Sequence, residues 1–491
     1  MSFSSLEFYL LAAACVAGYY ILPPKARRFW LLFISFIYYA AAGPVFFVYL
    51  LFAAFTTWAG ALRASDGKRI AVAIPLLLDF GVLAALKYSN FAISIINRLP
   101  HADLPYLKLL LPLGISFYTF QSAGYLLDVY WKRCEAEKSF LKYLLFVSFY
   151  PQIMQGPIGR YGTLAPQLQT AHAYDPENIR RGIVRICWGL FKKMIVADNA
   201  ALYVNQIFDN YVTLRGYGIQ GVLMYSIQLY ADFSGGIDIA IGIAQMLGIR
   251  LDANFRQPYF AETLTDFWHR WHITLGTWMK DYLFYPISLS DWMSRMRKFT
   301  RKRFGRDLGS AICIGVANII VFLAVGVWHG PSWHFIVYGL YNGVLIAIGG
   351  LFTKQFRKMK TALHLTDHTP WFRVFRIART FLIVNLSWYL DRSGSLGQAA
   401  RMLMDSFSTK IFSLTIISPE DPHFAMQHFV PIAAGCAVIF IVSVLREKKK
   451  DVEGTIARLP WPVLVLIITG ILILSALYGN RGSGGFIYAN F

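Results

Sequence analysis

The sequence predicts an all-α polytopic integral membrane protein, because apolar residues dominate it and its charges fall between long apolar runs. Hydrophobic residues make up 56% and charged residues 15% of its 491 positions, and the mean hydropathy is +0.46. A soluble domain has about a quarter of its residues charged, so this chain needs an apolar solvent. Its length suffices for about a dozen membrane helices of ~20 residues each, with loops between them.

Apolar runs long enough to cross a bilayer occur along most of the chain. They lie near residues 6–23, 29–42, 44–62, 70–88, 109–131, 180–197, 217–250, 308–328, 332–352, 372–390, 428–445 and 459–478. The run at 217–250 is predicted to form two helices that break at Ser234-Gly235-Gly236. Because no repeat of about 20–50 residues is found, we expect one integral-membrane domain over 1–491, with a motif-bearing core at about 109–352.

The net charge of +20 comes from short Lys/Arg clusters between these runs, which is the pattern of cytoplasmic loops. The clusters are Lys25-Arg27-Arg28, Arg63 to Arg69, Lys132-Arg133, Arg295 to Arg306, Lys354 to Lys360 and Arg446 to Lys450. We expect them to face the cytoplasm, and the 89–108 and 391–427 loops and both termini to lie outside. No basic surface forms inside lipid, so no nucleic-acid partner is expected.

Two segments interrupt the apolar pattern. Residues 146–162 contain Pro151, Gly156 and Pro157, and residues 255–290 mix aromatic with charged side chains. Irregular, polar backbone at membrane depth survives only where protein or a water-filled cavity surrounds it. We therefore expect re-entrant or interfacial helices that line a cavity.

His329 is the first candidate catalytic residue. It stands in AVGVWHGPSWHF between two apolar runs, so it is expected at membrane depth or near the outer edge of the membrane. Ionisable groups there are costly and tend to be functional, and an imidazole suits a general base that takes a proton from a hydroxyl. The alternative is a histidine that is hydrogen-bonded to a carbonyl of a neighbouring helix.

His269 and His272 lie three residues apart and so on one helix face. A zinc pair is conceivable, but Asp266 is the one carboxylate nearby and no cysteine stands at a suitable spacing. The five cysteines show neither a metal knuckle nor a disulfide framework. We therefore expect no metal site.

Further polar and aromatic residues are candidates to contact substrate or to line the cavity. They are Trp271, Trp328, Asp232, Ser234 and Gln121. Asp232 and Asp238 stand in an apolar stretch and must either pair or face water. They either bind substrate or satisfy arginine and backbone groups at a helix break. For Gln121 and Asp128, interhelical hydrogen bonding is the favoured alternative.

Several long motifs, in this order, resemble the membrane-bound O-acyltransferase (MBOAT) family. They are PLGISFYTFQSAGYLLDVY (112–130), FYPQIMQGPIGRY (149–161), GLFKKMIVADN (189–199), QLYADFSGGIDIAIGIAQMLGIRL (228–251), the 254–287 segment around WHRWHITL, WHGPSW (328–333) and FIYANF (486–491). Within the family they are most similar to the bacterial alginate O-acetyltransferase (AlgI-like) branch. The teichoic-acid D-alanyl transferases (DltB-like) are its cousins.

The resemblance implies a fold and a chemistry. The fold is a ring of about 11–13 transmembrane helices, with re-entrant or interfacial helices, around a central funnel and tunnel. The family's membrane histidine falls on His329 and its second histidine on His272, which makes both catalytic. An acyl thioester, acetyl-CoA or an acyl carrier protein, approaches from the cytoplasm, and no cofactor is tightly bound. The acceptor, a cell-envelope polysaccharide or an extracytoplasmic acetyltransferase, approaches from the other side of a bacterial cytoplasmic membrane.

Other interpretations stay open. D-alanyl transfer from a carrier protein to teichoic acid is one, and a transporter of lipid or polysaccharide explains broken helices and buried charges equally well. A non-catalytic anchor for a polysaccharide machine would leave the buried histidines without a role. The Arg295 to Arg306 cluster either receives an acidic partner, such as coenzyme A phosphates or a carrier protein, or sets topology and contacts anionic lipid.

Overall fold

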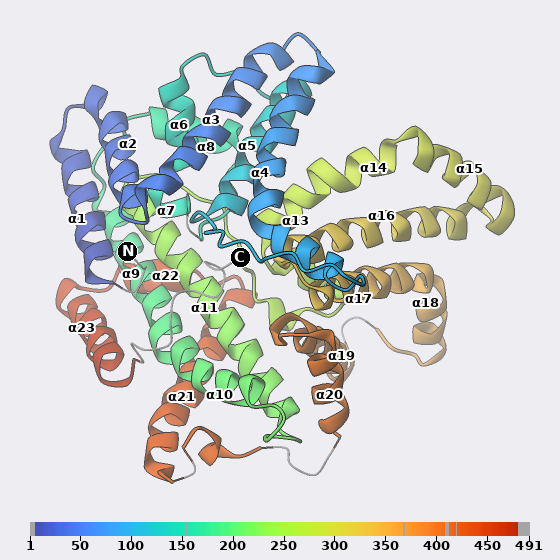
Figure 1. The fold of residues 1–491 in the computed structure, drawn as a ribbon. Helices are drawn as coiled ribbons and strands as arrows, with labels where there is room; N and C mark the ends of the chain where they lie inside the picture. Colours follow the sequence, from blue (N-terminus) through green and yellow to red (C-terminus); the bar gives the residue numbers. More distant parts are fainter. Residues whose placement is uncertain (1–4, 154, 367–368, 408–411, 419, 480–491) are drawn as a thin grey trace. The chain divides into compact units, whose positions relative to one another are not determined.

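The fold is all-helical, as the sequence predicts (Figure 1). The computed structural model describes residues 5–153, 155–366, 369–407, 412–418 and 420–479, and every regular element within these ranges is a helix. Six described helices are long and apolar enough to cross a membrane: Pro44–Ala64, Arg69–Ile96, Arg306–His329, Trp333–Leu351, Pro422–Glu447 and Trp461–Tyr478. The expected total of about 11–13 stays a prediction. The motif at 486–491 lies outside the described residues.

The chain forms two compact units. The first comprises Met1–Asn199, Gln228–Ala253 and Gln427–Phe491, and the second comprises Ala200–Ile227 and Asn254–Met426. The expectation of one domain over the whole chain stays a prediction.

The helices of the first unit differ widely in length, from the four residues of α7 to the 28 residues of α4. They are α1 (Leu6–Ile21), α2 (Pro24–Ala40), α3 (Pro44–Ala64), α4 (Arg69–Ile96), α5 (Ile115–Tyr130), α6 (Phe140–Ser148), α7 (Tyr150–Ile153), α8 (Tyr161–Gln169), α9 (Pro176–Leu190), the π-helix Phe191–Ala197, α22 (Val452–Ala457), α23 (Trp461–Tyr478), and parts of α10 (Asp198–Asp209), α11 (Gly218–Met246) and α21 (Pro422–Glu447). Phe8 of α1, Tyr38 of α2 and Tyr150 of α7 meet in its core, with ring centroids 5.7–6.3 Å apart. This aromatic contact holds the short helix α7 in place.

The predicted interruption at 146–162 is confirmed, because α7 has only four residues and α8 begins at Tyr161. Gln152 fixes the loop after α7: its Nε2 donates to Pro157 O over 2.6 Å and to Gln121 Oε1 over 3.1 Å. Gln121 Nε2 in turn donates to Phe146 O over 2.7 Å. Gln121 thus hydrogen-bonds between segments, as its favoured alternative predicts.

Glycines bring α9 and α11 into close contact. A Cβ atom at Gly189 would lie 2.6 Å from the carbonyl oxygen of Gly235, and one at Gly242 would lie 2.7 Å from that of Gly182. Helix α11 is continuous from Gly218 to Met246, so the predicted break at 234–236 is wrong. Glycine costs a helix interior about 0.5–1 kcal/mol, but small residues also let helices approach, and here the packing offsets that cost.

Buried ion pairs join the π-helix after α9 to α11. Lys193 Nζ lies 2.6 Å from Asp232, and Lys192 Nζ lies 2.5 Å from Asp238 and donates to Ser234 Oγ over 2.8 Å. All five side chains are buried. Buried charges must be paired. Asp232 and Asp238, which were expected either to pair or to face water, are therefore paired, and their main partners are lysines.

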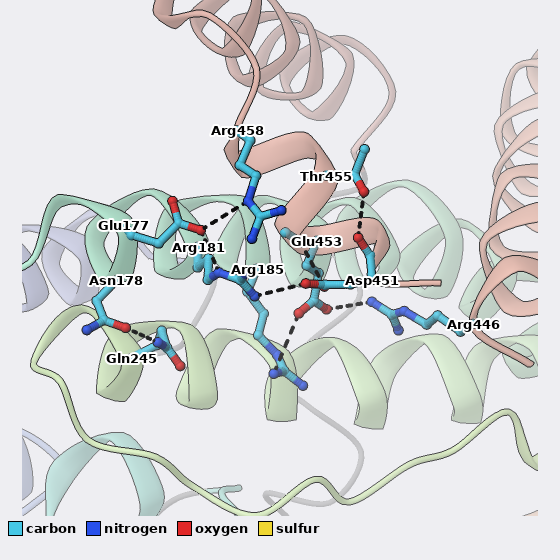
Figure 2. A network of polar contacts seen from close by, with 11 residues as sticks. Glu177, Asn178, Arg181, Arg185, Gln245, Arg446, Asp451, Glu453, Thr455 and Arg458 are labelled. Atoms are coloured by element: carbon cyan, nitrogen blue, oxygen red, sulfur yellow. Dashed lines mark hydrogen bonds and ion pairs between the residues drawn. The ribbon is translucent and has the colours of Figure 1, made fainter. Parts of the chain in front are cut away.

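Figure 2 shows how acidic residues around α22 hold the C-terminal segment against α9. Glu453 lies 2.5 Å from Arg446 and 3.7 Å from Arg185, and Asp451 lies 3.2 Å from Arg181. Exposed ion pairs contribute little singly, but Glu453 is shared between two arginines and is partly buried. The segment between α21 and α23 is therefore fixed at several points.

The second unit contains the predicted broken region at 255–290 and two of the long apolar helices. Its helices are η2 (Pro258–Phe260), α12 (Leu264–Arg270), α13 (Ile273–Met279), the π-helix Lys280–Phe284, α14 (Tyr285–Leu289), α15 (Asp291–Phe304), α16 (Arg306–His329), α17 (Trp333–Leu351), α18 (Thr353–Ala362), α19 (Pro370–Arg392), α20 (Leu396–Asp405), η4 (Leu414–Ile417) and the remaining parts of α10, α11 and α21. The irregularity predicted for 255–290 is confirmed in its first half, where the chain turns at His272 between the short helices α12 and α13. From Ile273 to Leu289 the chain is continuously helical, with a π-helical stretch in the middle.

Helices α16 and α17 form a hairpin whose backbones touch. A Cβ atom at Gly326 would lie 2.4 Å from Phe335 O, and one at Gly339 would lie 2.3 Å from Phe322 O. Gly326 stands one turn before His329. The place of His329 beside α17 is therefore set by backbone contact, which is stiffer than contact through long side chains.

The glycine contact between α9 and α11 can be tested by a pair of alanine substitutions. Gly189→Ala should lower the free energy of unfolding by about 1–3 kcal/mol, because the helices must move apart. Gly81→Ala on α4 is the matched control, since nothing lies within 4 Å of a Cβ atom there, and it should be neutral or stabilising by up to about 1 kcal/mol. The measurement is thermal unfolding of the purified protein in detergent. Equal effects of the two changes would contradict the packing account.

Candidate functional site

The site is built at the end of α16, where the chain must leave the helix. Pro331 disfavours helical backbone in the residue before it, and Gly330 is extended with φ 173° and ψ 168°. His329 is therefore the last helical residue, and its side chain is buried.

An aspartate from α19 lies against this histidine. His329 Nδ1 is 3.1 Å from Asp391 Oδ1, and both side chains are buried. The other carboxylate oxygen of Asp391 accepts a hydrogen bond from the hydroxyl of Tyr225 over 2.7 Å. All three residues belong to the second unit.

This arrangement selects one form of the imidazole. An ionised Asp391 favours a proton on Nδ1 of His329, so the lone pair of the neutral ring lies on Nε2. The same carboxylate stabilises the imidazolium that forms when Nε2 takes up a proton. His329 therefore has the electrostatic surroundings of a general base.

His272 is held in an unusual backbone conformation between α12 and α13. Its φ is +46°, in the left-handed region, which costs a non-glycine residue about 1–3 kcal/mol and often marks a functional position. Asn254 holds this turn, because its carbonyl oxygen accepts from Ile273 N over 3.0 Å and its Oδ1 accepts from Thr274 N over 2.9 Å.

The surroundings of His272 keep it neutral. Burial, and to a lesser degree the neighbouring His329, lowers the pKa of His272 to about 3. Because Asn254 Oδ1 accepts from the backbone of Thr274, it is an oxygen, and the Nδ1 of His272, 3.3 Å away, is the donor. The Nε2 of His272 is then a hydrogen-bond acceptor.

Both predicted catalytic histidines lie against one indole. The ring centroid of Trp328 is 5.8 Å from that of His272 and 5.1 Å from that of His329. Tyr338 of α17 lies 4.9 Å from His329 on ring centroids. The structure thus brings His329, His272 and Trp328 into one site.

Trp271 belongs to the aromatic cluster that adjoins this site. Its ring centroid lies 5.6 Å from that of Trp388, which is 6.1 Å from Tyr338 and 6.2 Å from Tyr225. These aromatic rings form an apolar environment around His329 and Asp391. The low dielectric constant of this environment strengthens the electrostatic interaction between the two side chains.

Three further candidates, Asp232, Ser234 and Gln121, belong to the first unit, where each has the partner described above. His269 is exposed, in contrast to His272. In the part of the chain that the structure describes, no group of three or more His, Cys, Asp and Glu side chains gathers in a way that could hold a metal ion.

Sequence reasoning missed Asp391 and Tyr225, and it expected little effect from a change at His334. Asp391 could have been noticed in the sequence, because it is a carboxylate that directly follows the apolar run at 372–390. It was assigned instead to the start of the 391–427 loop. His334 is buried, and its Nδ1 lies 2.8 Å from the carbonyl oxygen of Leu390, the residue before Asp391. His334 therefore helps to place the end of α19 that carries the aspartate.

Known proteins resemble this chain over most of its length. Residues 136–389 match the sequence profile of MBOAT, the membrane-bound O-acyltransferase family. The probable alginate O-acetylase AlgI of Azotobacter vinelandii is 33% identical over 422 residues, which cover 83% of this chain and 78% of that protein. The peptidoglycan O-acetyltransferase of Helicobacter pylori is 30% identical over an alignment of 528 residues, covering 96% and 94%. The teichoic acid D-alanyltransferase of Bacillus subtilis is 28% identical over 292 residues, covering 57% and 68%.

The depressed pKa of His272 predicts a pH dependence of stability. The pKa is about 3 in the folded protein and near 6.5 for a free histidine, so between these values the unfolded state binds more protons. Stability should fall as the pH drops below about 6.5, by up to ~1.4 kcal/mol per pH unit from this group.

Thermal unfolding between about pH 7.5 and about pH 5 measures this effect. His272→Gln should make the melting temperature fall less steeply over this range than in the wild type, whereas His269→Gln, which alters an exposed side chain, should retain the wild-type slope. A wild-type slope in His272→Gln would show that His272 is not held neutral.

Proposed function

The chain belongs to the membrane-bound O-acyltransferase family and is a multi-pass membrane O-acyltransferase; from this premise we propose that it moves an acetyl group from a thioester to a cell-envelope polysaccharide. The donor approaches from the cytoplasmic face of a bacterial cytoplasmic membrane. The acetyl group reaches the polysaccharide directly or through a partner acetyltransferase outside the membrane. The observation that carries the proposal is the buried pair of His329 and Asp391.

The proposed chemistry needs one base and no metal ion. The Nε2 of His329 takes the proton of the acceptor hydroxyl as its oxygen attacks the thioester carbonyl. Asp391 stabilises the resulting imidazolium. The tetrahedral intermediate then expels the thiolate, which takes the proton from His329, so that an ester and a free thiol are the products and the histidine is neutral again.

His272 has a positioning role in this proposal. A neutral ring whose Nε2 is an acceptor can receive the hydrogen bond of the acceptor hydroxyl and orient its oxygen. It is poorly suited to steady an oxyanion, because that requires a donor. The contact with Asn254 therefore favours the orienting role.

Acetyl transfer is favoured over D-alanyl transfer by the extent of similarity. An alginate O-acetylase aligns with 83% of the chain, and a D-alanyltransferase aligns with 57%. The donor is proposed as acetyl-CoA or an acetylated carrier protein, bound only during turnover. The rival function from another class is transport without covalent change, which gives the buried contact between His329 and Asp391 no role.

Substitutions at the histidine and the aspartate test the mechanism. His329→Ala should nearly abolish acetylation, because a general base contributes about 10²–10⁴-fold. Asp391→Asn should cost at least about 10²-fold, since an amide no longer favours the required tautomer. His272→Ala should cost less, because water can partly replace an orienting group.

The measurement is the acetyl content of exported polysaccharide from cells that hold each variant at a matched level in the membrane. His269→Ala is the control, because this side chain is exposed, and it should leave acetylation unchanged. Normal acetylation by the His329 variant would remove the catalytic assignment.

The orientation can be tested with single cysteines. Lys302→Cys on α15 should react with a membrane-impermeant maleimide only after the cells are permeabilised, and Arg401→Cys on α20 should react in intact cells. The unsubstituted chain gives the background, since its five cysteines are buried or partly buried. Labelling of position 302 but not of position 401 in intact cells would reverse the topology.

A further inference from the structure

Helix α18 carries an apolar stripe along one face. Phe356 and Met359 lie within the helix, and Phe352 and Leu363 flank it at its two ends. These four positions follow one another at intervals of four, three and four residues, so their side chains lie on one face. Each of the four keeps 46–59% of its surface exposed, and none of the ten residues of α18 is buried. The described part of the chain therefore leaves this stripe uncovered.

The opposite face of α18 is basic. A separation of two residues places side chains on opposite sides of a helix. Lys354 has this separation from Phe356. Arg357 has it from Met359, and Lys358 adjoins Arg357. All three basic side chains are exposed, and residues 353–366 contain neither aspartate nor glutamate. The helix is therefore amphipathic, with positive charge on its polar face.

The position of α18 in the chain puts it at a membrane surface. Helix α17 is long and apolar enough to cross a membrane, and one residue, Phe352, separates its end from the start of α18 (Figure 1). Lys354 of α18 forms an ion pair with Asp307 in the first turn of α16. Because α16 and α17 form a hairpin, the start of α16 and the end of α17 lie at the same surface. The lysine and arginine residues there favour the cytoplasmic side.

The length of α18 excludes a second crossing of the membrane. Ten residues span about 15 Å at 1.5 Å per residue, which is half of a hydrocarbon core of ~30 Å. A helix with one apolar and one basic face lies in the membrane plane, with its apolar side chains about 5–10 Å deep at the boundary of headgroups and acyl chains. Lysine and arginine on the other face attract the anionic lipids of the cytoplasmic leaflet. A lipid surface therefore matches both faces of α18, whereas water matches only one.

We propose that α18 binds anionic phospholipids at the cytoplasmic surface of the membrane. Its apolar stripe inserts beside the acyl chains, and Arg357 and Lys358 contact lipid phosphates. The same helix sets the depth of the α16–α17 hairpin in the bilayer, because α18 directly follows α17 and Lys354 pairs with α16. His329 lies at the opposite end of this hairpin. The inference concerns a contact with lipid and does not depend on which group the protein transfers.

The test uses the purified full chain in nanodiscs, with a fluorophore on either face of α18. Met359→Cys places the fluorophore on the apolar stripe. Thr361→Cys, two residues further on, places it on the opposite face and is the matched control. The unsubstituted chain gives the background, since its five cysteines are buried or partly buried.

Two quenchers report what surrounds each face. The discs consist of phosphatidylcholine with about 30% phosphatidylglycerol, which supplies the anionic surface. A phospholipid that is spin-labelled near its headgroup should quench the fluorophore at position 359 more than that at position 361. Acrylamide, a neutral quencher dissolved in water, should show the reverse order.

The role of charge is tested by lipid composition and by substitution in parallel. Replacing phosphatidylglycerol by phosphatidylcholine should lower the ratio of inserted to detached α18, which is read from the lipid quenching at position 359. Arg357→Gln combined with Lys358→Gln should lower this ratio in the anionic discs by about fivefold for each charge removed. In discs of phosphatidylcholine alone the double change should have little effect, because that surface has no net charge.

Lys302→Gln combined with Arg303→Gln on α15 is the matched control, since it removes the same charge from exposed residues of another helix. It should leave the quenching at position 359 unchanged. The comparison of the two lipid mixtures needs no change in the charge of the protein, so it decides the question even if the double variant fails to fold.

Three results would overturn the proposal. Acrylamide quenching at both positions, without lipid quenching, would leave α18 in water. Shielding of position 359 from both quenchers would assign the stripe to a second copy of the chain. Lipid quenching that is equal in the two lipid mixtures would show insertion without a role for anionic lipid. An inactive protein that shows the expected quenching would overturn the proposed function and leave this inference intact.

Discussion

The structure depends on one constraint: an ionisable side chain that is removed from water must have a partner of opposite charge or a hydrogen bond. His329 meets it through Asp391, and Asp391 meets it through Tyr225 as well. This fixes three helices, α16, α19 and α11, at one point. The backbone contact at Gly326 and the His334 contact to Leu390 then leave the pair little freedom to separate.

The two units meet the same constraint in different ways. In the first unit, Lys192 and Lys193 are each matched by carboxylates of α11, and the pairs hold helices together. At His329 the partner of the carboxylate is an imidazole, which can hold one proton or two, so this pair can exist in two protonation states. The lysine–aspartate pairs of the first unit are therefore structural, whereas the pair of His329 and Asp391 can transfer a proton.

Much of the fold could be predicted because hydrophobic runs depend on local sequence. The interruption around Pro151 and the isolated position of His329 were visible for the same reason. Asp391 was not, since its pairing joins residues 62 positions apart and only the folded chain brings them together. The continuity of α11 was mispredicted because Gly235 packs against Gly189, and a packing glycine looks like a helix breaker in sequence.

The central claim is that the protein transfers the acyl group covalently, with His329 as the general base, and does not merely transport its substrate. Release of free thiol by the purified protein, followed with a thiol reagent in the presence of an acetyl thioester and a hydroxyl acceptor, tests it most directly. The account predicts one thiol for each ester formed, with acceptor-dependent release that His329→Ala removes. Movement of the substrate across a proteoliposome membrane without thiol release, or release that persists in the variant, would contradict it.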